Sequence, residues 1–207
     1  MLIPLLCWGC GGPARRAEPL CTSCRLSMRR LPAHLVLAEG VTLWAPLAYE
    51  GPARELVRAL KFRGAVRVAE AMAAQVVANA PGGVLDDGVL VPVPLHPSRR
   101  RRRGFNQARL LAEAMSRRTG LEVWDRLSRS GAPRTQVGRG RRERRAGPAG
   151  AVHTGGRGRG WGAAPPRAVL VDDVATTGGT LAACAQALRA GGTEEVVAVT
   201  FARTLGR

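Results

Sequence analysis

The sequence of 207 residues contains few aromatic side chains, a single lysine and no long apolar run. Phe, Trp and Tyr make up only 4% of the chain. Proteins that hold single-stranded nucleic acid by base stacking need several such rings, so this scarcity argues against a dedicated protein of that class. A membrane-spanning helix requires a run of about 18 apolar residues, and the sequence contains no such run. The apolar start at residues 1–6 is too short for a secretory signal and has no basic lead. We therefore expect a cytoplasmic protein with no membrane span.

The charge of the chain is strongly positive. Its 32 Lys and Arg residues against 15 Asp and Glu residues give a formal net charge of +17. All of these cations except Lys61 are arginine. Such a charge indicates polyanionic ligands, namely nucleic acid, pyrophosphate or both. The length allows one α/β core and a small appendage.

Four of the five cysteines form two CxxC knuckles near the start of the chain: Cys7 with Cys10, and Cys21 with Cys24. Two such knuckles can present four thiolates tetrahedrally to Zn²⁺. A segment this small buries little apolar surface, so a metal would supply the missing folding energy. We predict a structural zinc module over residues 1–37; redox-active or unpaired thiols are the alternatives. His34 is interpreted as an exposed linker residue, and the fifth cysteine, Cys184, as a buried thiol on one face of a helix.

Asp172 and Asp173 follow an apolar run, residues 168–171, that is typical of a buried parallel strand. A turn rich in Thr and Gly comes next, and a helical pattern begins at Leu181. A strand, a short turn and a helix start form a phosphate cradle, because backbone N–H groups and the positive helix end face one anion. The carboxylates can accept ribose hydroxyls or hold Mg²⁺. The alternative is an ordinary capped turn without a ligand.

A second strand, residues 89–94, precedes five consecutive arginines that end at Arg103. Asn106, or the glycine before it, caps the following helix. We interpret residues 99–101 as a solvated basic loop, and Arg103 as a ligand residue. Lys61 fits either a solvated helix end or a ligand contact. Strands at residues 89–93, 121–127, 168–172 and 196–201 alternate with helices and predict a mainly parallel sheet; residues 41–49 predict a further strand at its edge because of Pro46.

Residues 168–180 resemble the signature for 5-phosphoribosyl 1-diphosphate (PRPP) of type I phosphoribosyltransferases. The resemblance implies that Asp172 and Asp173 face the ribose hydroxyls, and that the turn from Thr176 to Thr180 holds the 5-phosphate. The implied PRPP-binding residues are Asp172, Asp173, Ala175, Thr176, Thr177, Gly178, Gly179 and Thr180. Ala175 departs from the branched aliphatic residue that the signature prefers at its position.

Residues 103–105 resemble an Arg-Gly-Phe loop that contacts pyrophosphate in several of these enzymes. The resemblance implies that Arg103 and Gly104 bind pyrophosphate, with Lys61 as a further candidate, and that Mg²⁺ accompanies PRPP. It also places residues 129–166, a basic segment rich in Gly, Arg and Pro, where these enzymes carry a mobile loop that closes over PRPP. An arginine-rich insertion that tethers nucleic acid is the alternative.

The order of the motifs, from the knuckles through residues 61–62, 91–94 and 103–108 to the acidic pair and its turn, resembles the ComF family. These are phosphoribosyltransferase-like proteins linked to natural competence and DNA uptake. The resemblance implies a type I phosphoribosyltransferase-like α/β domain over residues 41–207, with a mainly parallel sheet flanked by helices. Gly147 and Val152 depart from the family pattern.

Two functions follow from this resemblance. The first is a Mg²⁺-dependent phosphoribosyltransferase whose acceptor the sequence does not identify. The second is a PRPP-sensing or single-stranded-DNA-binding module without turnover, which works with other competence proteins during transformation.

Overall fold

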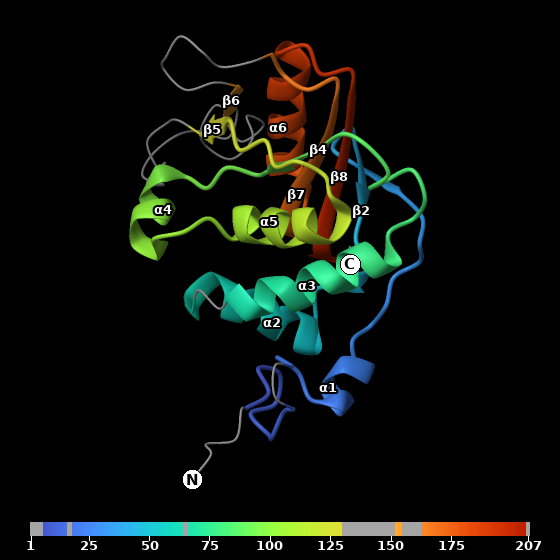
Figure 1. Cartoon of the computed structure of the whole chain (residues 1–207), viewed down its shortest axis with the longest axis vertical. Helices are drawn as coiled ribbons and strands as arrows, with labels where there is room; N and C mark the ends of the chain where they lie inside the picture. The colour runs from blue at the N-terminus through green and yellow to red at the C-terminus, as the bar shows by residue number, and fades with distance from the viewer. Residues whose placement is uncertain (1–5, 16–17, 64–65, 130–151, 155–162, 206–207) are drawn as a thin grey trace, which may run out of the picture.

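The computed structural model describes residues 6–15, 18–63, 66–129, 152–154 and 163–205. Its centre is a sheet in the order β1-β2-β8-β7-β4, with β3 also paired to β8 (Figure 1). The strands are β1 (Val36–Ala38), β2 (Val41–Trp44), β3 (Leu47–Ala48), β4 (Val89–Pro92), β7 (Arg167–Ala175) and β8 (Glu195–Arg203). Every pairing is parallel except that of β1 with β2. The prediction of a mainly parallel sheet is confirmed.

The long central strands β7 and β8 are apolar on both faces, as parallel strands covered by helices must be. On one face, Val169 and Val171 share a hydrophobic cluster with the helices α2 (Gly51–Arg63), α3 (Val66–Asn79) and α5 (Gln107–Thr119). On the other face, Ala168 and Leu170 pack with α6 (Gly179–Ala190). The expected buried position of Cys184 on one face of a helix, α6, is confirmed.

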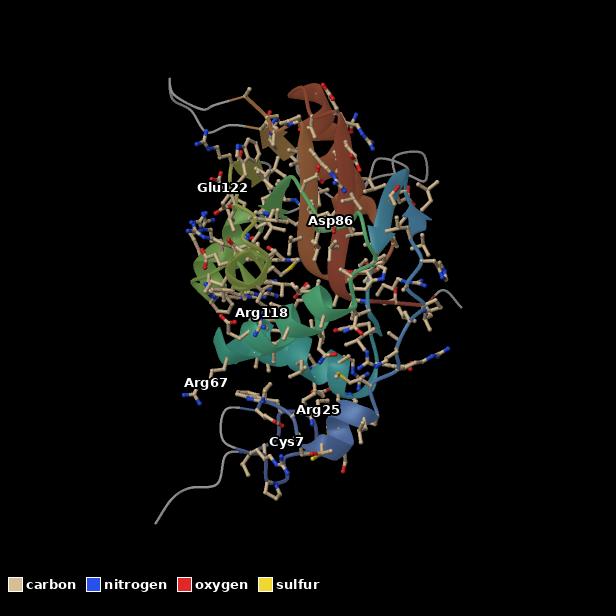
Figure 2. The ribbon with its side chains drawn as sticks, turned by 45° about the vertical axis from the view of Figure 1, so that its right-hand side comes forward. Cys7, Arg25, Arg67, Asp86, Arg118 and Glu122 are labelled. Carbon is tan, nitrogen blue, oxygen red and sulfur yellow. The ribbon has the colours of Figure 1, made fainter. Side chains whose placement is uncertain are left out.

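The cysteine segment lies against the helical face that carries α2. Cys7, Cys24 and Met28 belong to the same hydrophobic cluster as Leu56 and Leu60 of α2. The short helix α1 (Thr22–Leu26) completes the segment and lies below α2 in Figure 1, and Figure 2 shows Cys7 beside this helix. The cysteine segment and the sheet domain therefore share one apolar interface.

Two expected strands were wrong in extent. In residues 121–127 only Val123 reaches the sheet, through a single bridge to Leu90. The apolar run ends at Asp125, whose carboxylate pairs with Arg109 of α5 at 3.1 Å. The chain therefore does not continue along the sheet. A separate two-stranded sheet follows, in which β5 (Leu127–Arg129) pairs antiparallel with β6 (Val152–Thr154).

The strand expected over residues 41–49 is broken at Pro46 into β2 and β3. β2 is not an edge strand, because β1 covers its outer side. Pro46 lies at the break, where no ladder N–H is needed, and its carbonyl accepts the N–H of Leu31.

The arginine run predicted as a loop forms the helix α4 (Pro97–Arg103). Pro97 occupies the start of the helix, the ring of His96 accepts the N–H of Ser98, and Gly104 ends the helix at φ 80°. Five arginines carry no apolar periodicity, so the helix is visible in the sequence only through its Pro start and Gly stop. Asn106 then caps α5 by accepting the N–H of Ala108, as expected.

The loop predicted over residues 129–166 lies largely outside the described residues, which include only Arg129, β6 and the stretch from 163 onward. Among the helices that the structure describes, none is long and apolar enough to cross a membrane.

Candidate functional site

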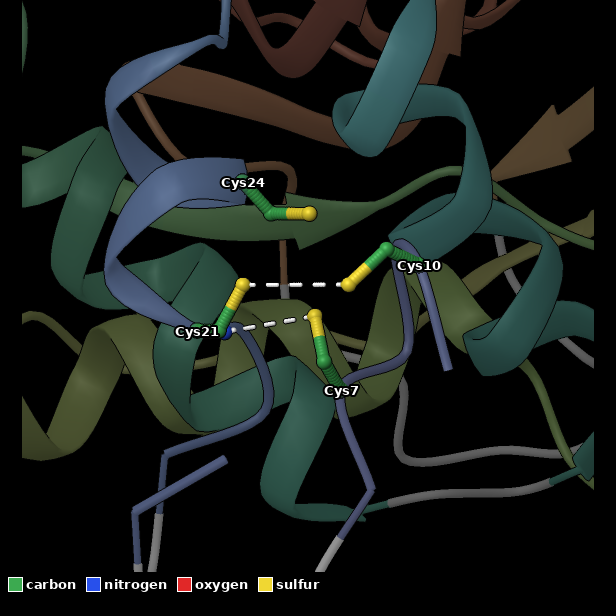
Figure 3. A group of neighbouring side chains, drawn as sticks. All are labelled: Cys7, Cys10, Cys21 and Cys24. Carbon is green, nitrogen blue, oxygen red and sulfur yellow. Dashed lines mark hydrogen bonds between the residues drawn. The ribbon is translucent and has the colours of Figure 1, made fainter. Parts of the chain in front are cut away.

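The four knuckle cysteines converge on one point (Figure 3). All four Sγ atoms lie within 4.8 Å of one another, and Sγ of Cys10 is 3.8 Å from Sγ of Cys21. Four sulfurs that each lie about 2.3 Å from a zinc ion stand roughly 3.8 Å apart in a tetrahedron. His34 is exposed and does not belong to the group. The set fits one tetrahedral metal ion such as zinc.

Backbone hydrogen bonds favour the thiolate form of one of these cysteines, Cys7. Sγ of Cys7 accepts N–H groups from Gly9 at 3.3 Å and from Cys21 at 3.2 Å. Burial raises the pKa of Cys7, but the backbone hydrogen bonds together outweigh it and lower the pKa to about 6. Gly9 lets the knuckle close, because a Cβ there would lie 2.9 Å from Sγ of Cys24.

The acidic pair stands on β7, close to its carboxyl end. The strand runs beyond the pair, to Ala175, because Val174 and Ala175 continue the ladder with β8. Alternation along the strand directs Asp172 toward the α6 side and Asp173 toward the α2 side. The backbone N–H of Asp173 donates to Oδ1 of Asp172 at 2.8 Å, which fixes the first carboxylate at the strand end.

Burial raises the pKa of Asp172 well above its usual range, and the negative charge of Asp173 raises it further. Asp172 in turn adds to the effect of burial on Cys184, whose pKa rises to about 12. Two carboxylates held this close resist being ionised together. The pair is therefore suited to a cation or to hydroxyl donors, which relieve that repulsion.

Cations from two other elements meet the acidic pair. Nζ of Lys61, in the last turn of α2, lies 3.1 Å from Oδ2 of Asp173. The guanidinium of Arg103, the last residue of α4, lies 5.5 Å from the ring centroid of Phe62. Burial lowers the pKa of Arg103, and the charge of Asp173 raises it. The ends of α2, α4 and β7 thus form one charged cluster of Lys61, Arg103, Asp172 and Asp173.

Phe62 is a member of this neighbourhood that sequence reasoning did not select as a site residue. Its side chain is 68% exposed, although it is large and apolar. The available signal was its position next to the single lysine.

The turn after β7 follows the predicted strand–turn–helix course. Thr176 and Thr177 are exposed, Ala175 is buried beneath them, and α6 begins at Gly179, two residues before the predicted start. Gly178 is the N-cap of α6 at φ 87°. A Cβ at Gly178 would lie 2.9 Å from Cβ of Ala38, so the close approach of the β1 end requires glycine.

Gly104, unlike Arg103, lines a separate cavity away from the acidic pair. With Arg100 and Asn106 it lines a cavity of about 480 Å³ between α4, α5 and β5. Among the sequence-predicted residues, the structure thus brings Lys61 and Arg103 to the acidic pair, whereas Gly104 opens onto this other cavity.

Comparison with curated proteins gives relatives over the whole chain. DNA utilization protein YhgH of Escherichia coli (strain K12) is 30% identical over 235 residues, covering 99% of this chain and 100% of that protein. YhgH of Salmonella typhimurium is 31% identical over 241 residues with the same coverage. Competence protein ComFC of Bacillus subtilis (strain 168) is 31% identical over 113 residues, which are 54% of this chain and 45% of that protein.

No family model matches the chain. The full-length identity to YhgH nevertheless exceeds what a shared fold alone would give, and the ComFC match has the same level of identity. The four-cysteine group, the parallel sheet and the acidic strand end occur in the order that the sequence resemblance implied. The chain belongs to the ComF family.

Proposed function

We propose that the protein binds PRPP with Mg²⁺ through the cluster of Lys61, Arg103, Asp172 and Asp173 and transfers its phosphoribosyl group. The observation that carries the proposal is the convergence of three separate elements on the carboxyl end of β7. Ligands of open parallel sheets bind beyond this end of the strands. The domain that would do this work is residues 41–207, with residues 1–37 as its metal-binding module.

The turn from Thr176 to Thr180 is suited to a phosphate group. Gly178, the N-cap of α6, has no side chain to accept the N–H groups of the first helical turn. Those N–H groups and the positive end of the helix attract an anion, and the exposed hydroxyls of Thr176 and Thr177 add donors. In the proposed complex this turn holds the 5-phosphate, while Asp172 and Asp173 accept hydrogen bonds from the ribose hydroxyls.

Arg103 is suited to the pyrophosphate. Its Nε is buried and has no hydrogen-bond partner among the described residues. An unsatisfied buried donor is costly, and a charge-assisted bond to a phosphate oxygen would remove that cost. Lys61, 3.1 Å from Asp173, adds a second cation at the boundary between ribose and pyrophosphate. Bound Mg²⁺ would neutralise the departing pyrophosphate.

Calorimetric titration with PRPP and Mg²⁺ tests this assignment. Asp172→Ala/Asp173→Ala should abolish measurable binding. Arg103→Met should weaken it about 10- to 100-fold, the equivalent of one hydrogen bond to a charged group. Asp86→Ala, a change of an exposed carboxylate in a loop, is the matched control and should leave the affinity unchanged. Absence of binding by the wild-type protein, or equal affinity in the double variant, would refute the proposal.

A second candidate function is binding of single-stranded DNA without turnover. The relatives are named for competence and DNA utilization, which connects the family with DNA uptake. The observation that favours it is the exposure of four successive arginines of α4, residues 99–102. Binding through phosphates alone would weaken steeply with salt, with a slope of about −0.7 per neutralised phosphate. DNA affinity that follows salt in this way, without pyrophosphate release for any acceptor, would favour this second function.

A further inference from the structure

A groove of about 240 Å³ separates the first cysteine knuckle from α2. One wall is Trp8, and the other consists of Glu55, Arg58, Ala59 and Phe62. The spacing of these four residues (three, four and seven positions from the first) places them on one face of the helix. Two aromatic side chains thus line a single small groove.

Phe62 is exceptional among the apolar residues of α2. Leu56, Val57 and Leu60 are at most 2% exposed, whereas Phe62 is 68% exposed. The neighbouring residue Lys61 forms an ion pair with Asp173, and the guanidinium of Arg103 lies 5.5 Å from the ring centroid of Phe62. The groove therefore borders the charged cluster, because Phe62 lines the groove and its ring lies against Arg103 of the cluster. A large exposed ring beside a binding cluster is the kind of surface that ligands cover.

Trp8 belongs to the first of the two cysteine knuckles. It stands between Cys7 and Cys10, in a knuckle closed by the tight contact of Gly9 with Cys24. A metal ion on the four sulfurs would fix this knuckle, and with it the wall that Trp8 provides. The cysteine module would then have a task in ligand binding, in addition to supporting the fold.

The groove also has polar groups in its lining. Glu55 and Arg58 form a pair at 3.4 Å, so an acceptor and a donor stand side by side on the wall that carries Phe62. A flat aromatic ligand with both N–H donors and ring acceptors would complement the two aromatic side chains and this donor–acceptor pair. A nucleobase has this combination, and base–aromatic stacking stabilises such complexes.

We propose that the groove between Trp8 and Phe62 binds a free nucleobase-type heteroaromatic ring as the second ligand of the site. The proposal rests on the proposed function for the role of that ring, because it lies beside the cluster assigned to PRPP. A single ring system suits a volume of about 240 Å³, and a longer polymer segment does not.

Saturation-transfer NMR and calorimetry with adenine, hypoxanthine, cytosine and uracil, each with and without PRPP and Mg²⁺, test the proposal on the metal-loaded protein. At least one base should show saturation transfer to its ring protons. Phe62→Leu should lower the affinity for that base at least about fivefold, the lower limit for loss of one stacking partner. Phe62→Tyr should restore the affinity. Leu26→Ala, which removes another exposed apolar side chain outside the groove, is the control.

Trp8→Leu is the second variant, with its zinc content measured alongside. Trp8→Leu should lower the affinity for the base to a similar degree, while its affinity for PRPP stays within about twofold of the wild-type value. Equal base affinity in wild type, Phe62→Leu and Trp8→Leu would overturn the proposal. So would rings that bind only within a single-stranded oligonucleotide.

The two proposals fail separately. A protein that binds PRPP but none of the bases refutes the groove alone. A protein that binds a base in a Phe62-dependent manner but not PRPP retains the groove and refutes the proposed function.

Discussion

The ion pair between Lys61 and Asp173 gives a quantitative test of the charged cluster. Nζ and Oδ2 are 3.1 Å apart, and the two side chains are only 23% and 4% exposed. Lys61→Met leaves Asp173 buried beside Asp172 without its cation. Removing one partner of a buried pair costs about 3–5 kcal/mol, and the partial exposure of Lys61 favours the lower end, about 3 kcal/mol. For a chain of this size the melting temperature should fall by about 6–12 °C.

Urea unfolding monitored by circular dichroism measures the change, and a double-mutant cycle isolates the pair. Asp173→Asn alone should cost less, because Lys61 can turn toward solvent, and the double variant should recover at least about 1 kcal/mol of coupling. Arg58→Met is the control: its pair with Glu55 is exposed and should contribute below about 1 kcal/mol. A loss in Lys61→Met no larger than in Arg58→Met, with no coupling to Asp173, would refute the assignment of a buried charge cluster.

Three further predictions address other parts of the structure. Because the pKa of Asp172 is raised in the folded protein, the contribution of its protonated form to stability is lost as pH rises through that raised pKa. Asp172→Asn should therefore be more stable than wild type at pH 8. Thermal melts should show this advantage vanishing toward pH 4. Gly178→Ala should destabilise the protein more than Gly120→Ala, since both have positive φ but only the first meets another atom; equal losses would contradict the close contact. Metal analysis should give one zinc per chain for wild type and clearly less for Cys21→Ala, and chelation should lower the melting temperature of the wild type alone.

Much of the fold could be predicted because the apolar pattern and the tertiary environment agree. β7 and β8 are continuous apolar runs, and their burial on both faces follows directly from that composition. The helix over residues 66–79 has an alanine- and valine-rich face that the sheet covers. The knuckle spacing similarly predicts a four-sulfur group, because two CxxC pairs can face one metal ion.

The errors came from positions where a partner distant in sequence decides the structure. Residues 121–127 are apolar enough for a strand, but a single bridge to Leu90 and the pairing of Asp125 with Arg109 direct the chain elsewhere. β2 gained an inner position because β1 folds back on it. The arginines of α4 have no periodic pattern, so only the capping residues on either side indicated a helix.

The candidate site shows the same division. The acidic pair and its turn are contiguous in sequence and were predicted together. The contacts of Lys61 with Asp173 and of Arg103 with Phe62 join segments that no local pattern relates. The exposure of Phe62 could not be predicted from sequence, because it depends on how α2 lies against the cysteine segment.

The central position of β8 has a consequence for how the protein is made. β8 lies between β2 and β7, so β2 and β3 have no parallel partner until residues 195–203 have left the ribosome. At about 5–20 residues per second, the apolar strand β2 waits many seconds after its own synthesis. The cysteine knuckles, whose contacts are local, can bind metal early in that interval. We therefore expect nascent chains that stop before β8 to carry a formed metal module beside an open sheet edge, and to need chaperones until β8 closes it.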